Sequence, residues 1–192
     1  MIKSVIFDFD GTLVNSEGIK RRAYFEIFRD FPGSDEIVEN FLSSHERIPR
    51  AEAIRGILEK FGKDGIDEYL VRYGDYVEEK IINHGEIGGS EAVLEALSKD
   101  FPLYLNSGTP QASLENVIER KKWNKYFKGI YGAPPGTKAE NYKNILSSEN
   151  IDGGSAVIIG DGDDDKQIAS QHGSNFIHAS KLLDLSDIIK KL

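Results

Sequence analysis

The sequence predicts an α/β fold, a Rossmann-like doubly wound parallel sheet with an inserted all-helical segment. Short apolar runs recur along the chain and end in small or acidic residues, which is typical of buried parallel strands. Helical patterns separate these runs, and such alternation favours right-handed strand–helix–strand units. The stretch 16–85 differs, because it carries helical patterns and no convincing strand.

The expected strands, in chain order, are Val5–Phe7, Leu103–Leu105, Gly129–Tyr131, Ala156–Ile159 and Asn175–His178. The expected helices between and after the later strands are Glu91–Leu97, Gln111–Lys121, Lys138–Leu146 and Asp164–His172. Pro110 and Gly173 flank two of these helices as a typical start and end signal. This alternation predicts a parallel sheet with helices on its faces.

The helical segment carries four amphipathic patterns: Glu17–Asp30, Asp35–Ser44, Arg50–Phe61 and Asp67–Asn83. Glycine and proline residues separate the patterns, as expected of loops between helices. The expected domains are therefore an α/β core made of 1–15 and 86–192, and a helical domain made of 16–85.

The composition excludes several classes of function. Across 192 residues, 24 Lys plus Arg oppose 32 Asp plus Glu, a net charge of −8, which argues against a nucleic-acid partner. A phosphorylated small substrate is not excluded, because a local site can be positive inside an acidic protein. The chain contains no cysteine, which excludes disulfides, thiolate nucleophiles and Cys-ligated metals.

The remaining expectations concern location and assembly. No apolar run is long enough to span a membrane, and the N-terminus lacks the layout of a signal peptide. We therefore expect a cytoplasmic protein without a membrane partner. No sustained apolar surface pattern stands out, which favours a monomer.

Polar residues that could act in catalysis or binding follow the carboxyl ends of the expected strands. Since ligands bind at that edge in open α/β sheets, these segments should converge. The residues concerned are Asp8 and Asp10, then Ser107, Gly108 and Thr109, then Lys138, and finally Asp161 and Asp165.

The residue types at this edge favour a cation and a phosphoryl group. Several carboxylates in one place repel one another unless a cation compensates them. Oxygen ligands without cysteine or histidine favour a hard ion such as Mg²⁺. A lysine and hydroxyl groups beside that ion suit a phosphoryl group, and a carboxylate there can act as nucleophile.

Four motifs carry a resemblance to the haloacid dehalogenase superfamily. Asp8 to Thr12 resembles its first motif, DxDGT, and Asn106-Ser107-Gly108-Thr109 resembles the second. Lys138 matches the third motif, and Gly160 to Asp165 matches the fourth, GDxxxD. The order and spacing agree over essentially the whole chain. The helical segment resembles the small cap of the phosphoglycolate-phosphatase-like branch.

The resemblance implies a Mg²⁺-dependent phosphatase that hydrolyses a small phosphorylated metabolite. It implies that Asp8 is the nucleophile that forms an aspartyl-phosphate, and that Asp10 is the general acid and then the base. The resemblance gives the Mg²⁺ ligands as Asp8, the backbone carbonyl of Asp10, and Asp161, with Asp165 binding through water or holding Lys138. It places Ser107, Gly108 and Lys138 around the phosphoryl oxygens, and we add Thr109 as a substrate-binding residue.

Simpler interpretations remain open for some of these residues. Ser107 can also cap the helix after Pro110, Lys138 can be a solvated surface lysine, and Asp163 and Asp164 can be helix-start acids alone. Arg47 and Arg50, near Pro49, are candidates for binding a substrate carboxylate or second phosphate, and ordinary surface charge is the alternative.

Three other functions stay open beside the phosphatase. A phosphomutase of the same superfamily shares every motif. A non-hydrolytic phosphoacceptor or binding protein also combines Asp, Ser or Thr, and Lys on a doubly wound sheet. A degenerate scaffold is the third, although every motif residue is present. Asp10 and the helical segment argue against the phosphoacceptor, since a receiver domain has no cap.

Overall fold

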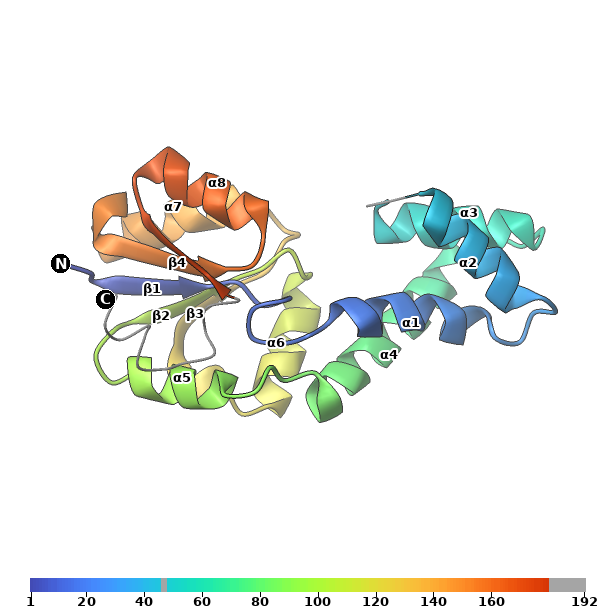
Figure 1. Ribbon diagram of the computed structural model, residues 1–192, viewed down its shortest axis with the longest axis horizontal. Helices are drawn as coiled ribbons and strands as arrows, with labels where there is room; N and C mark the ends of the chain where they lie inside the picture. The colour runs from blue at the N-terminus through green and yellow to red at the C-terminus, as the bar shows by residue number, and fades with distance from the viewer. Residues whose placement is uncertain (46–47, 180–192) are drawn as a thin grey trace. The chain divides into compact units, whose positions relative to one another are not determined.

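The computed structural model describes residues 1–45 and 48–179 (Figure 1). The chain divides into two compact units. One contains Met1–Ser16 and the chain from His84 onward, and the other contains Glu17–Asn83. The domain boundaries expected from the sequence lie one residue and two residues away from these positions.

The first unit is built on a parallel sheet of five strands in the order β3-β2-β1-β4-β5. The strands are β1 (Ser4–Phe7), β2 (Leu103–Asn106), β3 (Phe127–Tyr131), β4 (Ala156–Gly160) and β5 (Asn175–His178). The strand β1 lies in the middle, with Val5 beside Leu103 on β2 and Val157 on β4.

Helices cover both faces of this sheet (Figure 1). On one side lie α5 (Ser90–Leu97) and α6 (Gln111–Arg120), and on the other lie α7 (Lys138–Glu149) and α8 (Asp163–His172). Short 3₁₀ turns, η1 (Asn124–Tyr126) and η2 (Gly153–Ser155), precede β3 and β4. The predicted doubly wound α/β fold is confirmed.

Alternating side chains of the central strands form the core. Ile6, Tyr104 and Ile158 are buried against Tyr142 and Ile145 of α7. Their strand neighbours Val5, Phe7, Leu103, Leu105, Val157 and Ile159 are also buried and point to the opposite face. The central strands are therefore apolar on both faces, which is why their sequences read as continuous apolar runs.

The helix α7 is longer than the sequence pattern predicts. It was expected to end at Leu146, but it continues to Glu149 and ends at Asn150, which has a φ of 53°. A left-handed residue after the last turn is a common helix end, and asparagine tolerates it. At its start, Thr137 and Glu140 form reciprocal side-chain and backbone hydrogen bonds that fix the first turn, where Lys138 lies.

The second unit consists of α1 (Glu17–Phe28), α2 (Ser34–Ser44), α3 (Arg50–Lys60) and α4 (Ile66–His84), the last helix ending one residue into the first unit. Its core includes an aromatic cluster in which Phe28 stacks on Tyr69 at a centroid distance of 5.1 Å and Phe31 stacks on Phe61 at 4.5 Å. The helical content expected for this stretch is observed.

The two segments that connect the sheet to the helices pair with each other. Val14 and Glu86 form an antiparallel bridge. The N–H of Asn15 donates to the carbonyl of Gly85 at 2.7 Å, and the N–H of Ile87 donates to the carbonyl of Leu13 at 3.0 Å. The chain therefore leaves and returns to the first unit at one point.

Among the described helices, none has the length and apolar character needed to cross a membrane.

Candidate active site

Four strand ends bring the motif residues to one edge of the sheet. Asp8 directly follows β1, Ser107 follows β2, and Asp161 follows β4, while Lys138 opens the helix that follows β3. Because the strands are parallel, their carboxyl ends share that edge. The sheet thus brings together residues as far apart as positions 8 and 161.

The ammonium group of Lys138 lies among three carboxylates. Its Nζ is 2.7 Å from Asp165 Oδ1, 3.1 Å from Asp8 Oδ1 and 3.1 Å from Asp164 Oδ2. The Lys138 side chain is only 12% exposed, and those of Asp8 and Asp165 are 7% and 4% exposed. Lys138 is therefore not a solvated surface lysine.

Burial perturbs the protonation of this cluster. It raises the pKa of the Asp8 carboxyl to about 7 against the opposing effect of Lys138, and it raises that of Asp165 to about 6. Burial alone would lower the pKa of Lys138, but the carboxylates of Asp8 and Asp165 outweigh it and raise that pKa. One cation therefore does not compensate all the negative charge that the site can carry.

The carboxylates of Asp8, Asp161 and Asp165 fit a divalent cation. Each offers one oxygen, and these oxygens lie within 4.8 Å of one another. Asp165 Oδ2 is buried and has no hydrogen-bond partner among the described residues, as expected of an atom that awaits a ligand. An all-oxygen donor set suits Mg²⁺.

Two glycines make room for these carboxylates. A Cβ at Gly11, where φ is +74°, would lie 2.0 Å from Asp161 Oδ2. A Cβ at Gly160 would lie 2.4 Å from Asp165 Oδ2. The glycine after Asp10 therefore serves both the turn and the close approach of Asp161.

The side chain of Asp10 is held by two hydroxyl groups. Its Oδ2 accepts a hydrogen bond of 2.7 Å from Thr109 Oγ1, and its Oδ1 accepts one of 2.5 Å from Ser16 Oγ. The predicted group of metal carboxylates thus contains Asp8, Asp161 and Asp165, and the Asp10 side chain is not among them. Asp10 as a ligand through its backbone carbonyl stays a prediction.

Ser107 is fully buried at the end of β2. Its Oγ accepts a hydrogen bond of 3.0 Å from the backbone N–H of Thr109, which leaves the Ser107 hydroxyl proton free to point elsewhere. The Thr109 hydroxyl donates to Asp10. The expected substrate-binding role of Thr109 stays a prediction. The phosphoryl-binding roles of Ser107 and Gly108 stay predictions.

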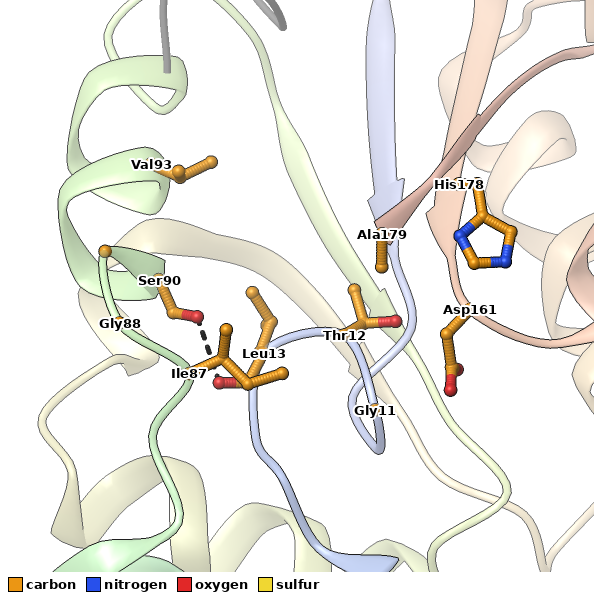
Figure 2. Close-up of a pocket in the computed structure, with 11 residues that line it drawn as sticks. Gly11, Thr12, Leu13, Ile87, Gly88, Ser90, Val93, Asp161, His178 and Ala179 are labelled. Carbon is orange, nitrogen blue, oxygen red and sulfur yellow. Dashed lines mark hydrogen bonds between the residues drawn. The ribbon is translucent and has the colours of Figure 1, made fainter. Parts of the chain in front are cut away.

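An apolar cavity of about 280 Å³ is lined by Gly11, Thr12 and Leu13 of the loop after β1 (Figure 2). Its walls are mainly Leu13, Ile87 and Val93, with Asp161 at one side, and Ser90 Oγ donates to the Leu13 carbonyl at 3.0 Å. His178 and Ala179 also line the cavity. The carboxylate cluster contributes only Asp161 to this cavity.

The two arginine candidates have different outcomes. Arg47 lies outside the described residues. Arg50, the first residue of α3, places its guanidinium 5.5 Å from the centroid of the Tyr73 ring, within the helical unit. Its role in substrate binding stays a prediction.

Sequence reasoning missed three contacts. Asp164 was left as a possible helix-start acid, yet it reaches Lys138. Asn106 donates from Nδ2 to the Lys138 carbonyl at 2.9 Å, and Ser16 donates to Asp10. A polar residue at the buried end of a strand, where the pattern calls for an apolar one, is the signal that identifies Asn106.

A family model described as haloacid dehalogenase-like hydrolase matches residues 5–179 of the chain. The match includes all four motifs. No curated protein matches.

Several solved structures are similar. A haloacid dehalogenase-like family hydrolase from Streptococcus pneumoniae is 26% identical, with a TM-score of 0.67 over 91% of this chain and 83% of that one. A Thermotoga maritima protein, provisionally described as a beta-phosphoglucomutase, is 19% identical, with a TM-score of 0.79 over 100% of both chains. A predicted phosphoglycolate phosphatase from Haemophilus somnus is 17% identical, with a TM-score of 0.74 over 98% of this chain and 97% of that one.

Proposed function

The chain belongs to the haloacid dehalogenase-like hydrolase family, and from that premise we propose that it is a Mg²⁺-dependent phosphatase of a small phosphorylated metabolite. The observation that carries the proposal is the position of Lys138 Nζ, 3.1 Å from Asp8 Oδ1 and 2.7 Å from Asp165 Oδ1. A lysine held beside a nucleophilic carboxylate suits a dianionic phosphoryl group.

Asp8 is the proposed nucleophile. One of its oxygens attacks phosphorus while the bond from phosphorus to the leaving oxygen breaks, which gives an aspartyl-phosphate. Lys138 and the hydroxyl of Ser107 stabilise the phosphoryl oxygens, together with the N–H of Gly108. These groups act by fixed position and charge, which is the main requirement of phosphoryl transfer.

Asp10 moves the proton in both steps. Its carboxyl group protonates the leaving oxygen in the first step. Its carboxylate then takes a proton from the water that attacks the aspartyl-phosphate, which releases inorganic phosphate and restores both aspartates. Such acid–base catalysis contributes about 10²–10⁴-fold.

Asp8, Asp161 and Asp165 are the side chains that would hold the metal. Bound Mg²⁺ supplies charge neutralisation at the phosphoryl oxygens. Without a cation, burial raises the pKa of Asp8 to about 7, so part of this carboxyl is protonated at neutral pH and is then a poor nucleophile.

The proposal includes a monomer that works in the cytoplasm, and it assigns the helical unit the role of a cap that contributes Arg47 and Arg50 to substrate binding. Support for the monomer comes from the surface, since Met1 and Val71 are the large hydrophobic residues recorded as exposed in the described chain. The cytoplasmic location and the cap role rest on the sequence pattern alone.

The test is phosphate release from a broad panel of phosphorylated metabolites, with Mg²⁺ and with EDTA, for the wild type and Asp8→Asn. We expect Mg²⁺-dependent release from a few related esters and a loss of at least about 10⁴-fold in the variant. Near-normal release by Asp8→Asn would overturn the mechanism.

Phosphate release, together with phosphoprotein formation from a small donor, separates the alternatives. A phosphomutase would return the phosphoryl group to a sugar hydroxyl and release little phosphate. A phosphoacceptor would accumulate stable phosphoprotein from a small donor such as acetyl phosphate and hydrolyse no ester.

A further inference from the structure

Two hydroxyl groups from distant parts of the chain bind the two oxygens of the Asp10 carboxylate. Ser16 Oγ donates to Oδ1 at 2.5 Å, and Thr109 Oγ1 donates to Oδ2 at 2.7 Å. Ser16 lies six positions after Asp10, whereas Thr109 lies 99 positions away. We propose that Thr109 and Ser16 form a clamp that positions Asp10 for proton transfer in both steps of the reaction.

Backbone hydrogen bonds hold the chain at Thr109 and next to Ser16. The N–H of Thr109 donates to Ser107 Oγ at 3.0 Å, so Thr109 is tied to the residue proposed to bind the phosphoryl group. Ser16 is buried, and its neighbour Asn15 donates to the Gly85 carbonyl at 2.7 Å. Neither hydroxyl therefore belongs to a freely moving side chain at an exposed loop tip.

The clamp matters because an aspartate side chain has two rotatable bonds. Holding both oxygens removes that freedom, so the oxygen that carries the proton faces the reacting atoms more of the time. A hydroxyl can donate to the carboxylate and, after rotation, accept from the protonated carboxyl. Thr109 and Ser16 thus suit both protonation states of Asp10 and act as positioning residues, since they reach the chemistry through Asp10.

The inference rests on the proposed phosphatase mechanism and deepens it. Its test uses a step that needs Asp10 and a step that does not. Acetyl phosphate transfers its phosphoryl group to Asp8 and leaves as acetate, which requires no proton. Hydrolysis of the resulting aspartyl-phosphate requires Asp10 to take a proton from water.

The experiment follows phosphoprotein formation from acetyl phosphate, and its decay after dilution, in the full-length protein with Mg²⁺. In Thr109→Val, which keeps the side-chain shape, we expect formation within about twofold of wild type and decay slowed about 10–100-fold, a part of the usual acid–base contribution. Ser16→Ala should slow decay by a smaller factor. The double variant should approach Asp10→Asn.

Two controls separate positioning from general damage. Thr109→Ser restores the hydroxyl and should bring decay back to within about threefold of wild type. Ser90→Ala removes a buried hydroxyl that donates to the Leu13 carbonyl in the same loop, and it should leave both steps within about twofold. Thermal unfolding confirms that each variant is folded.

The outcomes are distinct. Decay in Thr109→Val within twofold of wild type would overturn the clamp, as would equal slowing of formation and decay. A wild type that forms no phosphoprotein, or an Asp8→Asn variant that does, would overturn the proposed function and the clamp with it.

Discussion

The ion pairs of the two units have similar lengths but very different surroundings. In the helical unit, Arg21 and Glu39 meet at 2.6 Å, with side chains 49% and 50% exposed. At the sheet edge, Lys138 and Asp165 meet at 2.7 Å, with side chains 12% and 4% exposed. The length of an ion pair alone therefore says little about its contribution to stability.

Solvent explains the difference. Water screens the exposed pair, so this pair contributes little to the free energy of unfolding. The buried charges have lost their hydration, and their mutual attraction must compensate for that loss. The raised pKa of Asp8 shows that this compensation is incomplete. The helical unit holds its charges in solvent, while the sheet edge holds more carboxylates than the single ammonium group of Lys138 neutralises.

The largest effect should come from removing the buried positive charge of Lys138. We expect Lys138→Met to lower kcat/KM about 10²–10³-fold, because one fixed charge at the phosphoryl oxygens is lost. Steady-state phosphate release with Mg²⁺ measures this. The matched control is Lys121→Met, since the Lys121 side chain is also buried, at 7% exposure, and pairs with Glu86, which belongs to none of the four motifs. Equal losses in both variants would contradict the special role of Lys138.

The next effect concerns the close approach of Gly11 to Asp161. We expect Gly11→Ala to destabilise the protein by about 2–4 kcal/mol, through left-handed backbone strain and the clash with the carboxylate, and to weaken Mg²⁺ binding. Gly173→Ala has a similar φ of +66° but open space around its Cβ, so it should cost only about 1–2 kcal/mol. Urea unfolding and Mg²⁺ titration measure both variants, and identical behaviour would contradict the clash.

A smaller effect is the pH dependence of stability in EDTA. The folded protein raises the pKa of Asp8 from 3.8 to about 7 and that of Asp165 to about 6. Between about pH 4 and pH 7 the folded state holds protons that the unfolded state releases, so the free energy of unfolding should fall as pH rises through this window.

We expect Asp8→Asn to remove roughly 1–3 kcal/mol of that fall between pH 5 and pH 8. Denaturant unfolding at several pH values, with EDTA throughout, gives the comparison. An unchanged slope in the variant would show that Asp8 is not the titrating group.

The smallest effect should come from the exposed pair of the helical unit. Arg21→Gln should change the free energy of unfolding by about 0.5 kcal/mol or less and leave phosphate release unaltered. A loss of phosphate release as large as that of Lys138→Met would contradict the distinction between the exposed and the buried ion pair.

Much of the fold was predictable because strand ends in parallel sheets have a clear chemical pattern. Each central strand is a short apolar run, and the polar residues that follow it must lie at one edge. The cluster of Asp8, Lys138 and Asp165 follows from that rule and from the motif spacing. The end of α7 did not follow, because Asn150 marks a helix end only when its left-handed backbone is known.

The direction of side chains also limited what the sequence could predict. Whether Asp164 faces Lys138 depends on the phase at which α8 begins, since a rotation of one residue turns a side chain by about 100°. The contact of Ser16 with Asp10 depends on a turn within the Gly11–Val14 segment, which no periodic pattern describes. The contact of the Ser16 hydroxyl therefore escaped prediction, whereas the convergence of the strand-end residues Asp8 and Asp161 did not.

The paired connecting segments carry one more consequence. Since Val14 and Glu86 bridge each other, residues 17–83 form an insertion whose two ends meet at a single seam. Recombination at such a seam can exchange the whole insertion without disturbing strand order or the residues at the sheet edge. Sequence changes in the insertion and sequence changes at the sheet edge can then accumulate independently of each other.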